Sequence, residues 1–418
     1  MRIALSTIGS RGDVQPFVLL GSALRARGHD VWLATTPEFE NLVQGAGLEF
    51  RQLGSFGAGY VEEIMSHPRV QEALRRGPSM YRMAMAAPRP SAAEQLAFTE
   101  AMVASAEGAD LIINSNLTRI GALAQPGVPW CSVSAWPVTE TAAWPALGAP
   151  EWPLGGAYNR FTHRAMGTLE WLVYRAGVNQ ARRASGLPRA GFRSPFRDDG
   201  RTRPILYQFS PQIFAPPRDW PEQCHVTGYW SDNTRWEQSA ELTEFVEHGA
   251  PPLVTTFGSS WLPCGTDLLR ATLDAVRATG HRMVIIGGPA ADIPDDLDVF
   301  RSETADFTWL LPRAAAVLHH AGQGTTAAVV SAGVPQVVVP CYADQPLWAR
   351  RMHTLGVAPA PVPYAGLTGE KLAAAVRIAT TDPEIAARAM KLADAVRGDP
   401  GVEAAADVVE AYADSVSR

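Results

Sequence analysis

The sequence predicts an α/β protein with two doubly wound parallel sheets, one in each half of the chain. Short apolar runs alternate with helical patterns over the first 135 residues. A turn-rich segment with several prolines, at 214–233, interrupts this alternation, and the same pattern begins again at residue 251. Strands that alternate with helices pair in parallel, and the loops at their carboxyl ends bind ligands. We therefore expect two Rossmann-like halves of similar size, with the functional site in a cleft between them.

Each element of the first half is predicted from its local pattern. In the first helix, Phe17, Leu20 and Leu24 recur at helical spacing, and Gly28 suits the left-handed cap that ends a helix. A proline, Pro37, begins the second helix. The predicted strands lie at 2–8, 29–36, 48–53, 109–115 and 129–135, and the predicted helices at 14–28 and 37–47.

The second half repeats this order, and the segment before it differs in composition. Predicted strands lie at 251–256, 281–288, 315–320 and 335–340, and a helix at 268–280. These elements divide the chain into a first domain at 1–215, a linker at 216–235 and a second domain at 236–395. Tryptophans concentrate in 136–200, and they belong either to an ordinary core or to the wall of an apolar ligand site. In the second interpretation, Trp136 and Trp144 contact the ligand.

Composition excludes several classes of function. The net charge of −6 and the pI near 5.9 predict no broad basic surface for nucleic acid or anionic lipid. The four cysteines form neither a zinc pattern nor a disulfide framework, so we expect free thiols. No apolar stretch approaches the ~20 residues of a membrane helix, and the amino-terminal residues lack the pattern of a signal peptide. We therefore expect a cytoplasmic protein without an integral membrane segment.

A glycine-rich turn in the second half predicts an anion site. In "HHAGQGTTAAVVSAG", Gly322 and Gly324 lie where a buried strand turns into a helix that begins near Thr325. Free backbone N–H groups and the helix dipole bind anions at such a position. His320 stands beside the turn and can donate a hydrogen bond to a phosphate oxygen.

The next strand is followed by Asp344 and Gln345, a carboxylate and an amide that suit paired hydroxyls. A phosphate site and a polyol site on consecutive loops indicate a nucleotide sugar. The alternative is an aspartate that caps a helix next to a solvated glutamine.

The first loop, "GSRGDVQP", carries a carboxylate where phosphate-binding domains keep bare glycines. Asp13 would repel a phosphate, so either it caps the helix that follows or the loop binds something else. A dinucleotide dehydrogenase would need G-x-G-x-x-G here, and the sequence does not contain it at this loop.

Four stretches resemble bacterial natural-product glycosyltransferases of the antibiotic, macrolide and glycopeptide type, within the inverting UDP-glycosyltransferase family. They are "STIGSRGDVQPFVLLGSALRARGH", "HHAGQGTT", "AGVPQVVVP" and "ADQPLWARR". Sterol glucosyltransferases are similar in the same places, and the resemblance misses mainly 55–105 and 140–215. It implies the GT-B fold, a donor held by the second half and an acceptor held by the first. It also implies that a carboxyl-terminal helix at 396–418 crosses back to the first domain.

Carried over by position, the resemblance assigns donor contacts in the second half. The diphosphate would be held by His320 and the amides of the following turn, and by a serine of "TFGSS". The backbone within "WLLPR" would bind the base, and the carboxylate and amide after the next strand would bind the sugar. These donor residues are Ser259, Leu311, His320, Gly322, Gly324, Thr325, Asp344 and Gln345. The sequence departs from the family at Ala321, where glycine is frequent, and at Gln323.

In the first loop, the resemblance places Asp13 where many relatives carry a histidine general base. A solvated aspartate has a pKa near ~3.9, so burial would have to raise it. Ser10 would orient Asp13 or the acceptor. No acid follows the later strand at Asn114 and Ser115, and we expect no metal at "DIPDD" near Asp295.

The implied function is inverting transfer of a hexose from UDP-glucose or a dTDP-deoxysugar to a hydrophobic aglycone. The nucleotide sugar is a co-substrate, and no cofactor is expected. The alternatives are a sterol or lipid glucosyltransferase, a nucleotide-sugar epimerase, and an inactive accessory partner of another glycosyltransferase. We expect a monomer or homodimer, and residues 55–105 are expected to form a mobile acceptor loop or helix.

Overall fold

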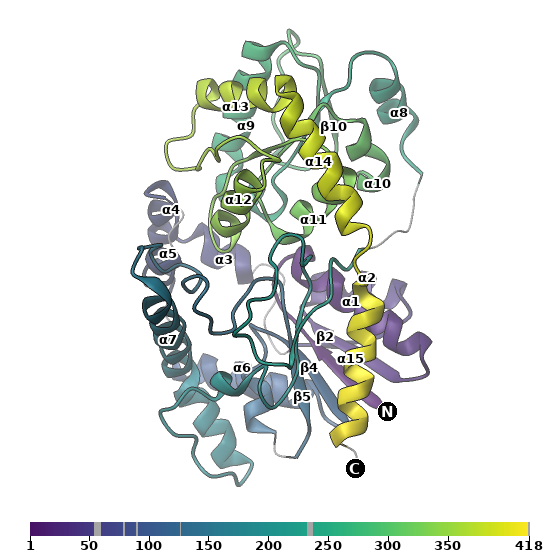
Figure 1. The fold of residues 1–418 in the computed structure, drawn as a ribbon. Helices are drawn as coiled ribbons and strands as arrows, with labels where there is room; N and C mark the ends of the chain where they lie inside the picture. The colour runs from purple at the N-terminus through teal and green to yellow at the C-terminus, as the bar shows by residue number, and fades with distance from the viewer. Residues whose placement is uncertain (54–59, 78–79, 89–90, 126, 232–236, 417–418) are drawn as a thin grey trace. The chain divides into compact units, whose positions relative to one another are not determined.

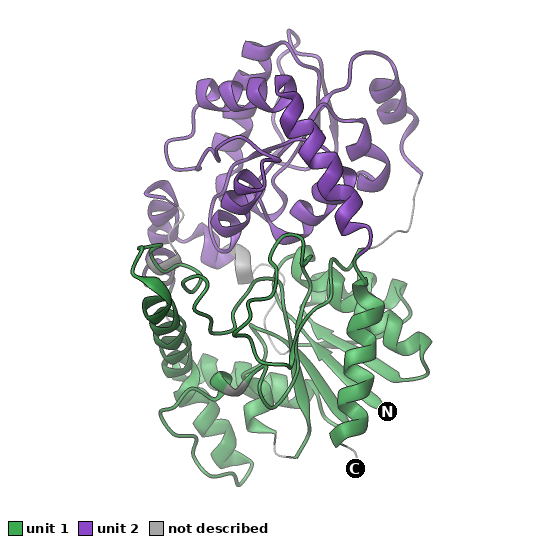
Figure 2. Ribbon diagram, viewed as in Figure 1, with its two compact units in different colours: residues 1–60, 88–231, 399–418 green, residues 61–87, 232–398 purple. Residues whose placement is uncertain are grey.

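The computed structural model describes residues 1–53, 60–77, 80–88, 91–125, 127–231 and 237–416. Contacts divide the chain into two compact units, which Figure 2 shows in different colours. Unit 1 comprises residues 1–60, 88–231 and 399–418, and unit 2 comprises residues 61–87 and 232–398. Each unit is built around a parallel sheet.

Unit 1 contains a seven-stranded sheet in the order β3-β2-β1-β4-β5-β6-β7, with every neighbouring pair parallel. The strands are β1 (Arg2–Ser6), β2 (Asp30–Thr35), β3 (Glu49–Gln52), β4 (Leu111–Ser115), β5 (Trp130–Ser134), β6 (Ile205–Tyr207) and β7 (Cys224–Val226). The helices are α1 (Arg11–Ala26), α2 (Glu40–Gly45), α6 (Ala92–Ser105), α7 (Gly155–Ala184) and α15 (Gly401–Val416), with 3₁₀ turns at Pro37–Phe39, Gly121–Ala124 and Pro195–Asp198.

Two segments of unit 1 are compared with the sequence interpretation: residues 216–231 and the carboxyl-terminal helix α15. Residues 216–231 were expected to be linker, but they belong to unit 1 because β7 completes its sheet beside β6. Helix α15 packs on α1 through Ala405, Ala406 and Val409 (Figure 1). At the edge of this contact, Arg27 forms ion pairs with Glu403, Asp407 and Glu410.

Unit 2 contains a five-stranded parallel sheet in the order β10-β9-β8-β11-β12. Its strands are β8 (Leu253–Thr256), β9 (Met283–Ile286), β10 (Val299–Ser302), β11 (Ala316–His319) and β12 (Gln336–Val338). Its helices are α3 (Tyr60–Ser66), α4 (Pro68–Arg75), α5 (Met80–Ala86), α8 (Ala240–Glu247), α9 (Trp261–Thr279), α10 (Phe307–Leu310), α11 (Gln323–Ala332), α12 (Gln345–Thr354), α13 (Gly369–Thr381) and α14 (Pro383–Val396), with 3₁₀ turns at Gly258–Ser260 and Leu311–Arg313.

Helices α3 to α5 belong to the core of unit 2, although they interrupt the chain of unit 1. Met65, Val70 and Leu74 are buried in the same cluster as Leu268 of α9. The sequence interpretation treated 55–105 as one acceptor segment, and the structure divides it between the two units. Spacing alone does not show which core an amphipathic helix covers. Residues 54–59, 78–79 and 89–90 of this segment lie outside the described residues.

Both sheets have the strand order that creates a topological switch point. In unit 1, the chain runs from β1 outward to β2 and then returns to β4 on the other side of β1. In unit 2, β8 and β11 are related in the same way. Ligands of open α/β sheets bind at the carboxyl ends of the two strands that flank such a point.

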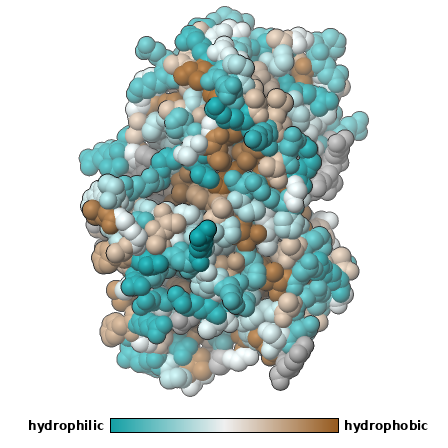
Figure 3. Space-filling model, in the orientation of Figure 1, coloured by the Kyte–Doolittle hydropathy of each residue, from teal (hydrophilic) through white to brown (hydrophobic). Residues whose placement is uncertain are grey.

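Hydrophobic and hydrophilic residues are interspersed over the face shown in Figure 3. Among the residues that the structure describes, no helix combines the length and the apolar character needed to cross a membrane.

Candidate functional site

In unit 1, the loop after β1 brings Ser10 and Asp13 together. Ser10 precedes the first residue of α1. Its backbone N–H and its Oγ–H donate hydrogen bonds to Asp13 Oδ2, at 2.7 and 2.9 Å. Gly9 makes this possible, because its φ is +133° and an added Cβ would lie 2.4 Å from Asp13 Oδ2. Asp13 therefore caps α1 through Ser10. Both hydrogen bonds go to Oδ2, so the other carboxylate oxygen of Asp13 is not used.

Burial raises the pKa of Asp13, and the two hydrogen bonds from Ser10 lower it by less. Desolvation disfavours the charged carboxylate, so Asp13 binds a proton more readily than a solvated aspartate does. This is the direction that a general base at this position requires.

Asp13 lines a small pocket at the switch point of unit 1. The pocket has a volume of about 20 Å³ and is lined by Thr7, Ile8, Asp13, Phe17, Ser115, Asn116, Leu117, Val133, Ala135, Trp136 and Gln208. A space of this size holds about one water-sized group. Six of the eleven lining residues are apolar, so a polar group that enters contacts the carboxylate beside apolar side chains.

The two tryptophans predicted to contact an acceptor lie in different surroundings. Trp136 lines the pocket with Asp13. Trp144 instead packs against Phe214 and Trp220, with ring centroids 5.8 and 6.1 Å away. The structure thus gives Trp144 a place in an aromatic cluster, whereas Trp136 is available to the site.

Asn116 was not among the predicted site residues, although it also lines the pocket. It is 9% exposed and donates from Nδ2 to Ser134 Oγ at 2.6 Å. Its Oδ1 is buried and has no hydrogen-bond partner among the described residues. The only sequence signal was its position immediately after a predicted strand.

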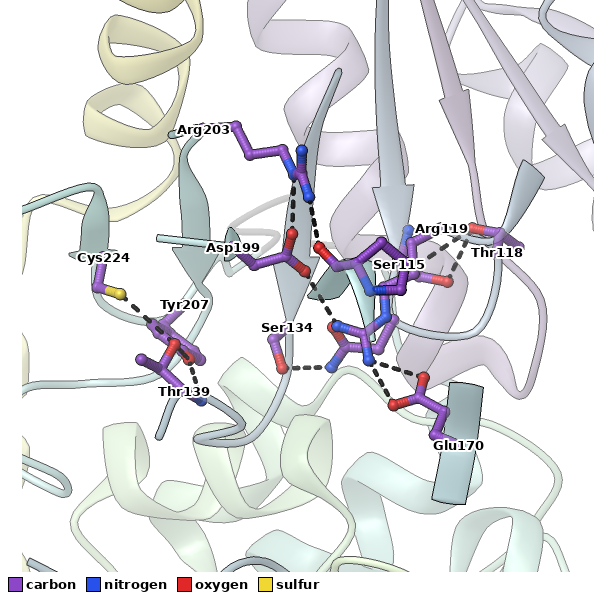
Figure 4. A network of polar contacts seen from close by, with 12 residues as sticks. Ser115, Thr118, Arg119, Ser134, Thr139, Glu170, Asp199, Arg203, Tyr207 and Cys224 are labelled. Atoms are coloured by element: carbon purple, nitrogen blue, oxygen red, sulfur yellow. Dashed lines mark hydrogen bonds and ion pairs between the residues drawn. The ribbon is translucent and has the colours of Figure 1, made fainter. Parts of the chain in front are cut away.

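A buried ionic network holds the turn that carries Asn116 (Figure 4). Arg119 is 5% exposed, and its guanidinium donates to both oxygens of Glu170 (2.7 and 2.6 Å) and to Asp199 (3.2 Å). Arg203 also binds Asp199, at 2.8 Å. At the start of the turn, Thr118 Oγ1 bonds to the Ser115 N–H and to the Ser6 carbonyl, which ties β4 to β1.

In unit 2, the amino end of α11 lies at the other switch point. Gly322 precedes the helix and has no side chain to cap it. The first intrahelical bond runs from the Thr326 N–H to the Gly322 carbonyl at 2.9 Å, so the Gly324 and Thr325 amides have no intrahelical acceptor. Such an end attracts an anion through its N–H groups and the helix dipole.

His320 lies against this turn and is 5% exposed. Burial lowers its pKa to about 3, with a smaller contribution from neighbouring His319, so the imidazole is neutral at physiological pH. Two glycines make room for the ring: a Cβ at Gly258 would lie 2.9 Å from Cε1, and one at Gly322 would lie 2.3 Å from Nε2. The structure thus brings His320 and the predicted phosphate-binding turn together.

Side chains from the segments that follow β8 and β12 meet beside this turn. Ser259 is exposed, and its Oγ lies 3.3 Å from the Tyr342 hydroxyl. Asp344 Oδ2 accepts from Trp348 Nε1 at 2.7 Å. Gln345 is 3% exposed; its Oε1 accepts from the Cys341 and Tyr342 amides, and its Nε2 donates to Ser260. The amide of Gln345 therefore braces the loop, and sugar binding by Gln345 stays a prediction.

Leu311 and Ala321 also have defined backbone roles. Leu311 is fully buried; its N–H bonds to the Phe307 carbonyl, and its carbonyl accepts from Ala314. A base contact at Leu311 therefore stays a prediction. Ala321 has a φ of +65°, the left-handed region that favours glycine, which agrees with the glycine that the resemblance implies at this position.

Within the described ranges, no group of three or more His, Cys, Asp or Glu residues is arranged to hold a metal ion. The described cysteines, including buried Cys131, Cys264 and Cys341, are free thiols.

Two family models match the chain. Residues 3–117 match the glycosyltransferase family 28 N-terminal domain, and residues 271–411 match the C-terminal domain of erythromycin biosynthesis protein CIII-like proteins. The O-mycaminosyltylonolide 6-deoxyallosyltransferase of Streptomyces fradiae is 44% identical over 420 residues, which cover 99% of this chain and 98% of that one. A sterol 3-beta-glucosyltransferase of Debaryomyces hansenii is 31% identical over 95% of this chain and 26% of its own length.

Solved structures of glycosyltransferases share the fold across the whole chain. The kitacinnamycin glycosyltransferase superposes with a TM-score of 0.71 at 20% identity and covers 98% of each chain. The calicheamicin glycosyltransferase CalG4 gives 0.67 at 20% identity, over 100% of this chain and 99% of that chain. VinC, solved in complex with DTDP, gives 0.65 at 19% identity, over 99% of this chain and 100% of that chain. The chain therefore belongs to the glycosyltransferase family that includes the Streptomyces fradiae macrolide enzyme, and it is a glycosyltransferase with the GT-B fold.

Proposed function

We propose that this glycosyltransferase moves a hexose from a nucleotide sugar to a hydroxyl of a hydrophobic natural-product aglycone, with inversion at the anomeric carbon. The observation that carries the proposal is the half-buried carboxylate of Asp13 in an apolar pocket, in a chain 44% identical to a macrolide glycosyltransferase. The acceptor is bound at the switch point of unit 1, with Trp136 beside Asp13.

In this mechanism, Asp13 removes the proton of the acceptor hydroxyl as its oxygen attacks the anomeric carbon. Burial has raised the pKa of Asp13, which increases its basicity. Ser10 keeps Oδ2 in place and leaves Oδ1 to receive the proton. The nucleoside diphosphate departs with the bonding electrons of the broken glycosidic bond.

The donor is bound by unit 2. The uncapped end of α11 and neutral His320 hold the diphosphate, and Ser259 supplies a further contact. Asp344 binds sugar hydroxyls. We favour a dTDP-linked 6-deoxyhexose over UDP-glucose, because the Streptomyces fradiae relative is a 6-deoxyallosyltransferase and VinC was solved with DTDP. The nucleotide sugar is a co-substrate, and the proposed reaction needs no cofactor and no metal.

The test compares wild type with Asp13→Asn in assays that detect release of dTDP or UDP. O-mycaminosyltylonolide is the first acceptor, and a sterol is tried beside it because sterol glucosyltransferases are also similar. We expect acceptor-dependent release of dTDP, and a turnover 10²- to 10⁴-fold lower in the variant, as for loss of a general base. Asparagine can still accept the Ser10 N–H bond, so the loop is expected to keep its conformation.

Asp110→Asn is the matched control, because Asp110 is a carboxylate of the same unit that bonds to Arg2 away from the pocket. Its turnover should equal that of wild type. Equal turnover of Asp13→Asn and wild type would show that Asp13 only caps α1. If the nucleoside diphosphate is released only when the sterol is present, the acceptor is a sterol and the macrolide assignment is wrong.

A further inference from the structure

Helix α7 of unit 1 buries several polar side chains and exposes several large apolar ones. Half of its buried residues are polar: Asn159, Thr162, His163 and Asn179 are all below 10% exposed. Their side chains hydrogen-bond to backbone groups of the neighbouring loops, which satisfies them. The exposed apolar residues of the same helix are therefore the ones to explain.

Several large apolar side chains of α7 are exposed. Phe161, Leu169 and Leu172 are 65%, 50% and 49% exposed, and their spacing of eight and three residues places them on one side of the helix. Met166 and Val173 widen this stripe, and Trp152, Leu154 and Phe192 extend it beyond the helix. Fifteen large hydrophobic side chains are exposed in the described part of the chain, and eight of them lie within residues 152–192.

The same segment is strongly basic in an acidic protein. Residues 151–203 contain ten arginines and four carboxylates, a formal charge of +6. Two of these arginines, Arg160 and Arg164, pair with Asp219 and Glu140 from outside the segment, which lowers its effective positive charge. Arg183, Arg189 and Arg201 are exposed, and no ion pair of theirs is found among the described residues. Arg197 is also exposed, but it lies close enough to Glu140 to lower the pKa of that carboxyl. The overall charge of −6 therefore conceals a basic surface that the composition alone did not predict.

The loop after α7 lies beside the helix, so the basic and apolar residues form one surface. Gly191 accepts hydrogen bonds from Trp171 and Arg175, and the Arg175 guanidinium stacks 3.9 Å from the Phe192 ring centroid. We call the outward residues of α7 and of 185–201 the α7 surface. Contiguous exposed apolar patches of this kind mark interaction sites.

We propose that the α7 surface binds the face of an anionic phospholipid bilayer. A helix with an apolar stripe, aromatic residues and flanking arginines lies in the interface of such a membrane. The apolar side chains protrude from α7 and insert among the lipids, while the arginines contact the phosphates. A second copy fits this surface less well, because two-fold pairing would place one +6 segment against another.

The test is co-sedimentation of the full chain with vesicles of phosphatidylcholine alone or mixed with phosphatidylglycerol. We expect binding only to the mixed vesicles, and weaker binding as salt is raised. Arg183→Glu combined with Arg189→Glu should weaken binding at least ~30-fold, since each arginine contributes about 1 kcal/mol near an anionic surface. Phe161→Ser combined with Leu169→Ser should also reduce binding, by loss of insertion.

Ile378→Ser combined with Met390→Ser is the matched control, because both side chains are exposed on helices of unit 2. This control should bind vesicles as wild type does, and a thermal melt of each variant verifies folding. Absence of binding to mixed vesicles would overturn the proposal. A dimer that becomes a monomer in Phe161→Ser/Leu169→Ser, without vesicle binding, would assign the surface to a second copy instead.

Discussion

The two switch points have the same topology and opposite chemistry. In unit 1, the helix after the first strand is capped by a carboxylate, so its amino end is already occupied by a negative group. In unit 2, the helix after β11 begins at a bare glycine beside a neutral histidine. One fold thus excludes an anion at one switch point and attracts it at the other. The difference arises from a few side chains in the loops.

The two sites are also braced differently. Unit 1 holds its turn after β4 with the buried charges of Arg119 and Asp199 and the partly exposed carboxylate of Glu170. Unit 2 braces its loop after β12 with the neutral amide of Gln345. Removing one partner of a buried ionic network leaves an uncompensated charge, which costs more than a lost neutral hydrogen bond.

The largest effect is expected at this ionic network. Arg119→Met should lower the free energy of unfolding by about 3 kcal/mol, because Glu170 loses its partner and buried Asp199 keeps only Arg203. Denaturant unfolding measures this change. Gln345→Met should cost less, about 1–3 kcal/mol, in keeping with a neutral brace. If Arg119→Met lowers the free energy of unfolding by less than Gln345→Met does, the ionic network contributes less to stability than the neutral amide.

The next effect is expected at Gly9. In Gly9→Ala, the new Cβ would lie 2.4 Å from Asp13 Oδ2 and require a φ of +133°, so the carboxylate has to move. We expect turnover to fall on the order of 100-fold while donor affinity is unchanged. Gly12→Ala is the control, since its Cβ meets only Ser10 Oγ at 3.6 Å. Equal rates for the two variants would mean that the position of Asp13 does not limit catalysis.

Unit 2 offers the corresponding substitution. In Gly322→Ala, the Cβ would lie 2.3 Å from His320 Nε2, which displaces the ring from the anion site. We expect dTDP to bind about tenfold more weakly, a loss of ~1.4 kcal/mol. Calorimetric titration with dTDP measures this change. Gly45→Ala, where no atom lies within 4 Å of the added Cβ, should bind as wild type does.

The raised pKa of Asp13 predicts a cost in stability. Because the folded protein binds this proton more tightly than the unfolded chain, stability falls as pH rises from the unfolded pKa of 3.8 to the higher folded pKa. At neutral pH, Asp13→Asn should therefore be more stable than wild type, by ~1.4 kcal/mol for each pKa unit of the shift. The gain should vanish below pH 3.8 in unfolding curves recorded against pH. A variant less stable than wild type at pH 7 would contradict this sign.

The smallest effect is expected at Ala321. Ala321→Gly removes the strain of a φ of +65° but increases the freedom of the unfolded chain. We expect the free energy of unfolding to rise by less than ~1 kcal/mol. A thermal melt that shows a clear loss of stability would mean that the buried methyl group contributes more than the strain costs.

Local pattern was sufficient for most of the strands and for the loops at the two switch points, but it did not predict β6, β7 and β10. Alternating apolar runs predicted the parallel sheets, and residues after strands predicted Asp13, His320 and Gly322, which the structure places at the two switch points. Pattern did not reveal Asn116 as a pocket residue or Trp144 as part of an aromatic cluster. Both depend on which side chains meet across different strands and loops.

The sequence by itself determined the strands β1 to β5, β8, β9, β11 and β12, the glycines of the turns and the family of the chain, because these depend on neighbours along the chain. Only the tertiary structure decided that α3 to α5 belong to unit 2, that β7 completes the sheet of unit 1, and that several large apolar side chains of α7 are exposed. A helix pattern shows that a face is apolar, but not what covers it. The burial that raises the pKa of Asp13 and lowers that of His320 has the same origin, since desolvation depends on atoms distant in sequence.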